Sequence, residues 1–351
     1  MKRAALIMMS LVMLATLLAG CNLPVLLPPL PTAAVLQSPV PGTPLYLPLI
    51  ELQATPSPAA EAGGLVNPLP LTLEAPVVIS EVPTATPVGL YAGPITTAQR
   101  TGQTISPDEW WNWPVLPVVS DRAREIYFWG LNQGTSVNRF SKIGDCQVIR
   151  QYFLGIFDDP TLYRLGPYED LIPTIDLFHG SWDRVSMSVR TGFNVASVLT
   201  AINADPSQCL PGEIPLECEF RIHNPSIAII SMETWTADRP VALYEQYLRQ
   251  IVEFTIARGV VPILATKADN LEGNHAINAA VVRVAYDYDI PLWNWWRVAD
   301  ALPDHGLTSD GFHLTHDSNF FDNEVAMEAA WPNRNLSGLQ AIDVVYRELN
   351  R

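Results

Sequence analysis

Short apolar runs alternate with helix-like segments between residues 137 and 350, and this alternation limits the fold more than any other feature of the sequence. Ile227 to Met232 is a continuous apolar run, typical of a strand buried on both faces. Val241 to Arg258 carries apolar residues at helical spacing and is followed by Gly259, a common residue after a helix end. Strands that alternate with helices indicate a parallel sheet covered by helices on both faces, so we predict a three-layer α/β/α domain. The expected strands, about five, are residues 137–143, 185–189, 227–232, 260–265 and 290–293.

The first 20 residues have the features of an export signal peptide. Lys2 and Arg3 precede an apolar stretch that ends at Ala19 and is too short to cross a bilayer comfortably. The segment Leu18-Ala19-Gly20-Cys21 resembles the lipobox of bacterial lipoproteins. That resemblance implies cleavage before Cys21 and lipidation of this residue, which would anchor the protein to a membrane on the extracytoplasmic side of the cell envelope. The alternative is an ordinary secretory signal with a chance cysteine.

Residues 21–105 are predicted to be a tether. Of the 31 prolines in the chain, 16 lie between Asn22 and Arg100, and this stretch contains no Cys, Trp or Lys. A sequence rich in Pro, Thr and Ala has few backbone donors and tends toward extended, polyproline-like conformations. We therefore expect a largely disordered tether and place the folded domain at residues 106–351, a length that can bury a sizeable core.

The formal net charge of −15 excludes some classes of partner. A protein this acidic is not expected to bind nucleic acid or anionic lipid through bulk electrostatics. His305 and His316 flank His313, but the carboxylates around them do not follow the spacing of a metal site. We therefore expect no metal and no nucleic-acid partner. Membrane contact is expected through the lipid anchor, and the protein is expected to be a monomer.

The four cysteines separate into the lipidated residue, a pair and a single residue. Cys209 and Cys218 flank a loop that contains Pro and Gly, and export places both in an oxidising compartment. The sequence predicts a disulfide between them, which closes a small loop and contributes about 2–3 kcal/mol. Cys146 is then the odd cysteine, at the end of the first expected strand.

Cys146 and a polar loop near the C-terminus have the residue types of a nucleophile, a base and an orienting acid. The apolar spacing after Cys146 predicts a helix over residues 147–155, which places the sulfur near backbone N–H groups that stabilise a thiolate and an oxyanion. Asp310 stands three residues before His313 in a loop that contains glycine. Taken alone, residues 141–147 are also compatible with a structural role for Cys146, as a small buried apolar residue after a strand.

Gly144-Asp145-Cys146 and Asp310-Gly311-Phe312-His313 resemble the first and last signature blocks of the SGNH/GDSL hydrolases, over about residues 110–351. The resemblance implies a flavodoxin-like parallel sheet and a cofactor-independent ester hydrolase, of esterase, lipase or carbohydrate deacetylase type. Its substrate would be a small-molecule or polysaccharide ester at the cell envelope. The family nucleophile is a serine, so the resemblance assigns that role to Cys146. It assigns the base and acid to His313, and the orienting role to Asp310.

The resemblance also assigns the groups that would hold the oxyanion. These are the backbone N–H groups of Cys146 and Gly192, although Gly192 fits an ordinary turn residue equally well. The third block departs from the family, which has Gly-x-Asn-Asp with the Asn side chain as a donor. This chain has Glu233-Thr234-Trp235-Thr236 instead. An ionised Glu233 that faced the site would oppose the oxyanion, because a carboxylate only accepts hydrogen bonds.

The departures at Cys146 and Trp235 leave a second function open. The chain could be a catalytically degenerate lipoprotein of this fold that binds a ligand or a carbohydrate outside the cytoplasm. The intact Asp310 and His313 favour the enzyme, because a site without catalysis does not need both. The residues predicted to line the cleft are Asp145, Asn194, Glu233, Trp235, Lys267 and Asn270, with Asn194 and Asn270 as substitute donors to the oxyanion.

Overall fold

A computed structural model describes residues 90–235 and 239–351. Its central sheet has four strands, all parallel, in the order β1-β3-β4-β5. Every residue of β3 and β4 is buried, as expected for central strands of a parallel sheet. The α/β class and the parallel sheet predicted from the sequence are confirmed. The strands are β1 (Ser136–Gly144), β3 (Pro225–Ser231), β4 (Val261–Ala265) and β5 (Leu292–Trp293).

The fifth expected strand, residues 185–189, is reduced to a single bridge. Val189 pairs in parallel with Gly144, whose N–H donates to the Ser188 carbonyl oxygen at 3.1 Å. The segment therefore runs along the outer edge of β1. The Ser188 N–H instead bonds the Ser186 hydroxyl at 3.1 Å, and such local side-chain bonds compete with a regular ladder.

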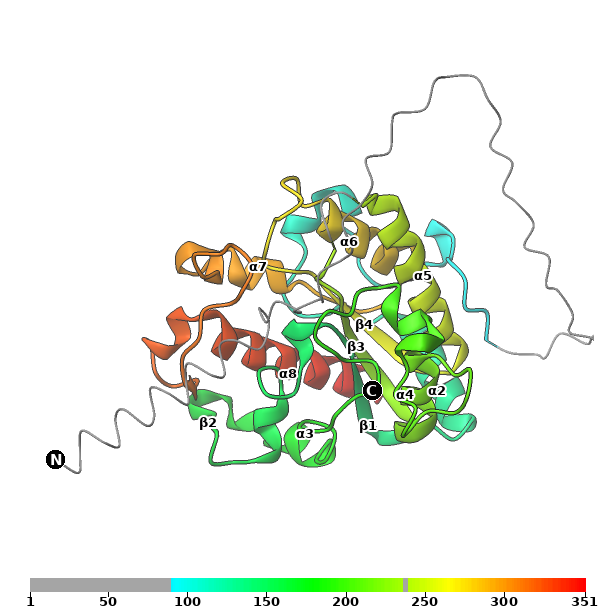
Figure 1. The fold of residues 1–351 in the computed structure, drawn as a ribbon, viewed down its shortest axis with the longest axis horizontal. Helices are drawn as coiled ribbons and strands as arrows, with labels where there is room; N and C mark the ends of the chain where they lie inside the picture. Colours follow the sequence, from blue (N-terminus) through cyan, green and yellow to red (C-terminus); the bar gives the residue numbers. More distant parts are fainter. Residues whose placement is uncertain (1–89, 236–238) are drawn as a thin grey trace, which may run out of the picture. The chain divides into compact units, whose positions relative to one another are not determined.

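Helices cover the sheet on two sides. The crossovers that contain α4 (Pro215–His223), α5 (Val241–Ala257) and α6 (Ala276–Tyr288) all run in the same direction across the sheet. Right-handed crossovers place these three helices on one face. Helix α2 (Asp121–Asn132) contacts α8 (Ala330–Leu349), and Figure 1 shows the strands lying between α8 and α5.

Shorter elements complete the described chain. Helix α3 spans Ile172–Leu177 and packs against α8, and helix α7 spans Trp295–Ala299 directly after β5. Strands β2 (Tyr163–Arg164) and β6 (Asn319–Phe320) pair in parallel as a separate small sheet. Loops and short 3-10 turns connect these elements.

The helix predicted over residues 147–155 is not formed. Cys146–Val148 make one turn of 3-10 helix, η4, and Ile149 then takes an extended backbone with ψ of 142°. Asn335 of α8 explains the difference, because its side chain accepts the Leu154 N–H at 2.7 Å and donates to the Tyr152 carbonyl oxygen at 3.1 Å. These contacts satisfy backbone groups that a helix would have paired.

Residues 90–105 belong to the predicted tether, but they pack against the folded domain. The Ile95 N–H donates to the Asp287 carbonyl oxygen at 2.9 Å. The Arg100 guanidinium lies over the Tyr286 ring, 3.3 Å from its centroid. These contacts place the domain boundary before residue 106. The composition of the proline-rich stretch did not reveal it, because the contacts depend on single side chains.

The signal peptide, Cys21 and most of the predicted tether lie outside the described residues, so these assignments stay predictions. Within residues 90–235 and 239–351, no helix is both long enough and apolar enough to span a membrane.

Cys209 and Cys218 lie at disulfide distance, as predicted, with 5.3 Å between their Cα atoms. The predicted loop between them is shorter than expected, because α4 already begins at Pro215, a residue suited to the first turn of a helix. The two sulfur atoms and the Glu213 carboxylate are the one cluster of metal-ligand type in the described part of the chain, and the disulfide already occupies both sulfur atoms. Cys146 takes no part in a disulfide.

Helix α2 and the turn before β4 approach so closely that only glycine fits at the contact. A Cβ atom on Gly130 would lie 1.9 Å from the carbonyl oxygen of Gly259. We expect Gly130→Ala to lower the free energy of unfolding by about 1–3 kcal/mol, because overpacking displaces the backbone. Urea denaturation would report a lower midpoint at an unchanged m-value. An unchanged midpoint would contradict the close contact.

Candidate active site

The loop at residues 307–314 holds Asp310 and His313 in hydrogen-bond contact. Asp310 Oδ2 lies 2.5 Å from His313 Nδ1. Asp310 Oδ1 accepts the backbone N–H groups of Phe312 and His313, each at 2.9 Å. Gly311 has a φ of +72°, which L side chains rarely adopt, so a glycine allows the chain to turn back between the two catalytic candidates. The three-residue spacing seen in the sequence thus becomes a direct contact.

The contact keeps Asp310 ionised and sets the tautomer of His313. The hydrogen bond from the His313 side chain holds the pKa of the Asp310 carboxyl well below its usual range. Because an ionised Asp310 can only accept, His313 Nδ1 donates, and in the neutral imidazole Nε2 then carries the lone pair. Nε2 is buried and makes no hydrogen bond to any residue of the described chain. This is the arrangement of a general base whose reacting nitrogen is available.

Asp145 fixes the turn that carries Cys146. The side chain is fully buried, and its Oδ1 accepts the Gln147 N–H at 3.0 Å. Its Oδ2 accepts the N–H groups of Glu233 and Thr234, each at 2.7 Å. Burial raises the pKa of the Asp145 carboxyl, and these three hydrogen bonds oppose that rise. Asp145 was predicted to line the cleft, but its contacts make it a structural link between the ends of β1 and β3.

A hydrogen bond from Gln147 brings the Cys146 turn and the His313 loop together. Gln147 follows Cys146, and its Nε2 donates at 3.2 Å to the carbonyl oxygen of Phe312, the residue before His313. Cys146 is 8% exposed, whereas 32% of the His313 side chain is exposed. Both lie at the carboxyl edge of the sheet, where ligands bind in parallel α/β folds.

Gly192 lies at the same edge, in the turn after the segment that pairs with β1. The turn is closed by a hydrogen bond of 3.0 Å from the Phe193 N–H to the Arg190 carbonyl oxygen, and Gly192 has a φ of +83°. The turn alone is therefore enough to account for a glycine here. Its N–H makes no hydrogen bond within residues 90–235 and 239–351, so it can donate to a bound oxyanion.

Glu233 forms a buried ion pair with Arg334 of α8. The two side chains meet at 2.5 Å, and both are almost completely buried. The Ser231 hydroxyl donates to Glu233 at 2.9 Å and accepts from Arg334 at 2.9 Å. The predicted repulsion between Glu233 and an oxyanion is therefore weakened, because Arg334 balances its charge. Four aromatic rings surround the guanidinium at 5.2 to 5.9 Å, those of Phe153, Trp295, Trp293 and Trp331.

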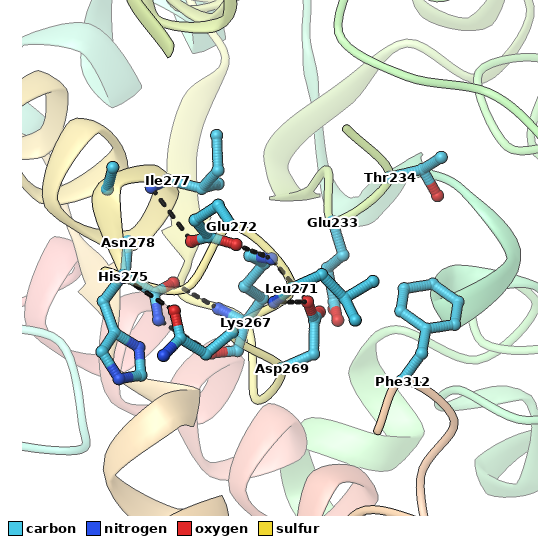
Figure 2. Close-up of polar contacts among 12 residues, drawn as sticks. Glu233, Thr234, Lys267, Asp269, Leu271, Glu272, His275, Ile277, Asn278 and Phe312 are labelled. Carbon is cyan, nitrogen blue, oxygen red and sulfur yellow. Dashed lines mark hydrogen bonds and ion pairs between the residues drawn. The ribbon is translucent and has the colours of Figure 1, made fainter. Parts of the chain in front are cut away.

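A second ion cluster follows β4 (Figure 2). Lys267 is 3% exposed, and its Nζ donates to Asp269 Oδ1 at 2.6 Å and to Glu272 Oε2 at 2.7 Å. Burial disfavours the charge on Lys267, but the two carboxylates outweigh it and raise the pKa of Lys267 above its ordinary value. Asn270 Oδ1 accepts the His275 N–H at 2.8 Å. Lys267 and Asn270, both predicted to line the cleft, therefore hold their own loop in place.

Two further residues predicted to line the cleft also have structural partners. Asn194 Oδ1 accepts the N–H groups of Ala196 and Ser197, at 3.0 and 3.2 Å, which caps its own turn. Trp235 is 9% exposed, and its ring packs edge-on against that of Tyr244 at 5.7 Å. A polar or aromatic residue at a strand end therefore marks local pairing here rather than exposure to a cleft.

The sequence analysis did not identify Gln147 or Arg334. Gln147 links the Cys146 turn to the His313 loop, and Arg334 pairs with Glu233. Arg334 has a signal that could have found it, because it lies three residues after Trp331 and seven before Ala341, on the buried face of α8. A charge on such a face indicates a buried partner. Gln147 has no comparable signal, since a single amide after a motif has many roles.

Two partly open cavities of the described chain have neither Cys146 nor His313 in their walls. The larger, about 250 Å³, is lined by Thr135, Pro225 and Val260, at the opposite end of the strands. The smaller, about 100 Å³, lies beside the outer edge of β1.

Comparisons of the chain with protein-family models, curated proteins and solved structures find no match. A function proposed for this chain therefore rests on its own residues and their geometry.

Proposed function

We propose that the chain is an ester hydrolase of SGNH/GDSL type in which Cys146 is the nucleophile. The main support is the contact between Asp310 and His313, which leaves a buried Nε2 atom available as a base. Gln147 ties the loop of this pair to the turn that carries Cys146. The order of the parallel segments, with residues 185–189 outside β1 and then β3, β4 and β5, is also the flavodoxin-like order expected of that family.

In this mechanism, His313 Nε2 takes the thiol proton as the Cys146 sulfur attacks the ester carbonyl carbon. The tetrahedral intermediate collapses, the C–O bond breaks, and His313 returns the proton to the leaving alcohol. A thioester on Cys146 remains. Water then attacks it with His313 as the base, the acid product leaves, and the thiol is restored. Asp310 orients the imidazole and stabilises its protonated form in both steps.

The oxyanion would be held by the backbone N–H groups of Cys146 and Gly192. Trp235 stands where the family has its asparagine donor, and the indole N–H of Trp235 is committed to the Arg239 carbonyl oxygen at 3.3 Å. The loss of one such donor typically lowers the rate by about 10²- to 10³-fold. We therefore propose a slow enzyme, acting on an acyl ester of an envelope polysaccharide or lipid.

Turnover of p-nitrophenyl acetate by the purified chain tests this proposal. Cys146→Ala is expected to reduce hydrolysis to the uncatalysed rate, whereas Cys146→Ser should keep part of the activity because it restores the usual nucleophile of the family. Circular dichroism would check that both variants fold. Equal turnover by the wild type and Cys146→Ala would exclude Cys146 as the nucleophile.

A ligand-binding module without catalysis is the second candidate. It is favoured by Trp235, which replaces the asparagine donor of the family and whose indole N–H already donates to the Arg239 carbonyl oxygen. A wild-type protein that binds an ester or an oligosaccharide without cleaving it would support this candidate over the hydrolase.

A further inference from the structure

The smaller cavity, about 100 Å³, lies between residues 148–151 and the segment 184–189. Three basic residues line it, Lys142, Arg150 and Arg184. We propose that this cavity binds a small oxyanion, namely a sulfate, phosphate or carboxylate group. The inference concerns a site separate from Cys146 and His313, and it holds whether or not the chain hydrolyses esters.

Lys142 supplies the charge that lacks a counter-ion. Its side chain is 2% exposed, and its Nζ donates to the carbonyl oxygens of Trp182 at 2.6 Å and Phe153 at 3.2 Å. No carboxylate of the described chain forms an ion pair with Lys142, in contrast to buried Lys267. An ammonium has three donors, so one is still available. Because a buried charge without a counter-ion is unfavourable, an anion in the cavity would stabilise Lys142.

The two arginines add donors and are themselves already paired. Arg150 contacts the Asp183 carboxylate at 2.7 Å, and Arg184 forms an ion pair with Glu219. A guanidinium has five N–H donors, so each arginine can bind a second oxygen without leaving its carboxylate. The charged groups that act on Lys142 are these two arginines and the carboxylates of Asp183 and Asp158. With Arg150 and Arg184 paired, the charge of Lys142 is the one left to attract an anion.

The size of the cavity limits what can enter. A cavity of about 100 Å³ holds on the order of several water molecules, which is enough for an oxyanion group but not for a sugar or a nucleoside. A larger molecule could bind only by inserting its anionic group. The N–H donors of the three basic residues therefore favour a negatively charged group with oxygen atoms. The ligand is either a free anion or the anionic group of a larger molecule.

Anion binding at Lys142 should depend on pH. Burial, and then the charge of Arg184, lower the pKa of Lys142 to about 7. The charged form binds the anion, and its fraction in the free protein falls as pH rises through this value. Sulfate keeps the same charge over this range, so its affinity should be about tenfold weaker at pH 8 than at pH 6.

Isothermal titration of the full chain with sodium sulfate, at constant ionic strength and pH 6, tests the site. Lys142→Met keeps the length of the side chain without its charge and should weaken sulfate binding by at least about tenfold. Arg150→Gln, at a partly exposed position, should weaken it severalfold without disturbing the core. Arg258→Gln is the matched control, because Arg258 lines the larger cavity, and it should bind as the wild type does.

The titrations of the three variants distinguish an anion site at Lys142 from its absence. Loss of binding in Lys142→Met and Arg150→Gln but not in Arg258→Gln supports the site. A wild type that binds no sulfate, or a Lys142→Met variant that binds it as tightly as the wild type, overturns the proposal. Titration with acetate, inorganic phosphate and a sugar phosphate identifies the source. Binding of the sugar phosphate indicates an anionic group on a larger molecule, and binding of the inorganic ions alone indicates a free anion.

Discussion

His313→Ala is expected to lower kcat for ester hydrolysis by about 10²- to 10⁴-fold. The expected loss follows from the position of Nε2, the one ring nitrogen that Asp310 leaves available for proton transfer. KM should change little, because the side chain acts on the thiol and the leaving group rather than on the resting substrate. Asp310→Asn should give a loss of the same order, since the amide no longer stabilises the protonated imidazole.

His305→Ala is the matched control for this prediction. His305 lies in the preceding loop, its side chain is 68% exposed, and it contacts Asp300 at 3.2 Å. Its loss should leave kcat and KM unchanged. Equal activity of His313→Ala and His305→Ala would show that the Asp310–His313 pair has no catalytic role.

Arg334→Met should destabilise the domain by about 3–5 kcal/mol, the largest stability effect we expect for a single substitution. Arg334 and Glu233 are both buried, so the substitution leaves the buried Glu233 carboxylate without its counter-ion. Solvent screening does not reduce this effect, because neither side chain reaches the surface. Urea denaturation at neutral pH would measure the change in the free energy of unfolding.

The double variant Arg334→Met with Glu233→Gln separates lost charge balance from lost packing. A neutral glutamine needs no counter-ion, so the double variant should recover most of the stability lost in Arg334→Met. If the double variant is as unstable as Arg334→Met alone, the effect comes from the packing of Arg334 among the tryptophan rings rather than from the ion pair.

The central part of the fold could be predicted because local sequence decides it. Residues 227–232 form a continuous apolar run, and a strand appears there as β3, Pro225–Ser231. The helix expected from Val241 to Arg258 ends one residue earlier, at Ala257, before the glycine that indicated its end. In both cases the apolar pattern lies within the element, and the residue that ends the helix lies directly after it.

The prediction of a helix after Cys146 was wrong, because a residue distant in sequence determines the conformation of that segment. Asn335 bonds Leu154 across 181 positions of sequence, and no local pattern reveals such a contact. The domain boundary was misplaced for the same reason, since Arg100 packs on Tyr286. Propensity in a short segment is weak compared with several tertiary hydrogen bonds.

In the candidate site, too, contacts between residues close in sequence could be predicted and contacts between distant residues could not. The contact between Asp310 and His313 could be predicted because the two residues lie three positions apart in one turn. The pairing of Glu233 with Arg334 could not, because it joins the end of β3 to α8 across 101 positions. The sequence therefore suggested that the Glu233 carboxylate would repel an oxyanion, whereas in the folded chain Arg334 balances its charge.

The most direct test of the proposed mechanism is to trap the acyl-enzyme. The wild-type chain is mixed with p-nitrophenyl acetate, quenched with acid within the first turnover, and digested for mass spectrometry. A thioester mechanism predicts one acetyl group on the peptide that contains Cys146, absent in Cys146→Ala and strongly reduced in His313→Ala. Continued turnover with the acetyl group on another residue, or on none, would contradict Cys146 as the nucleophile.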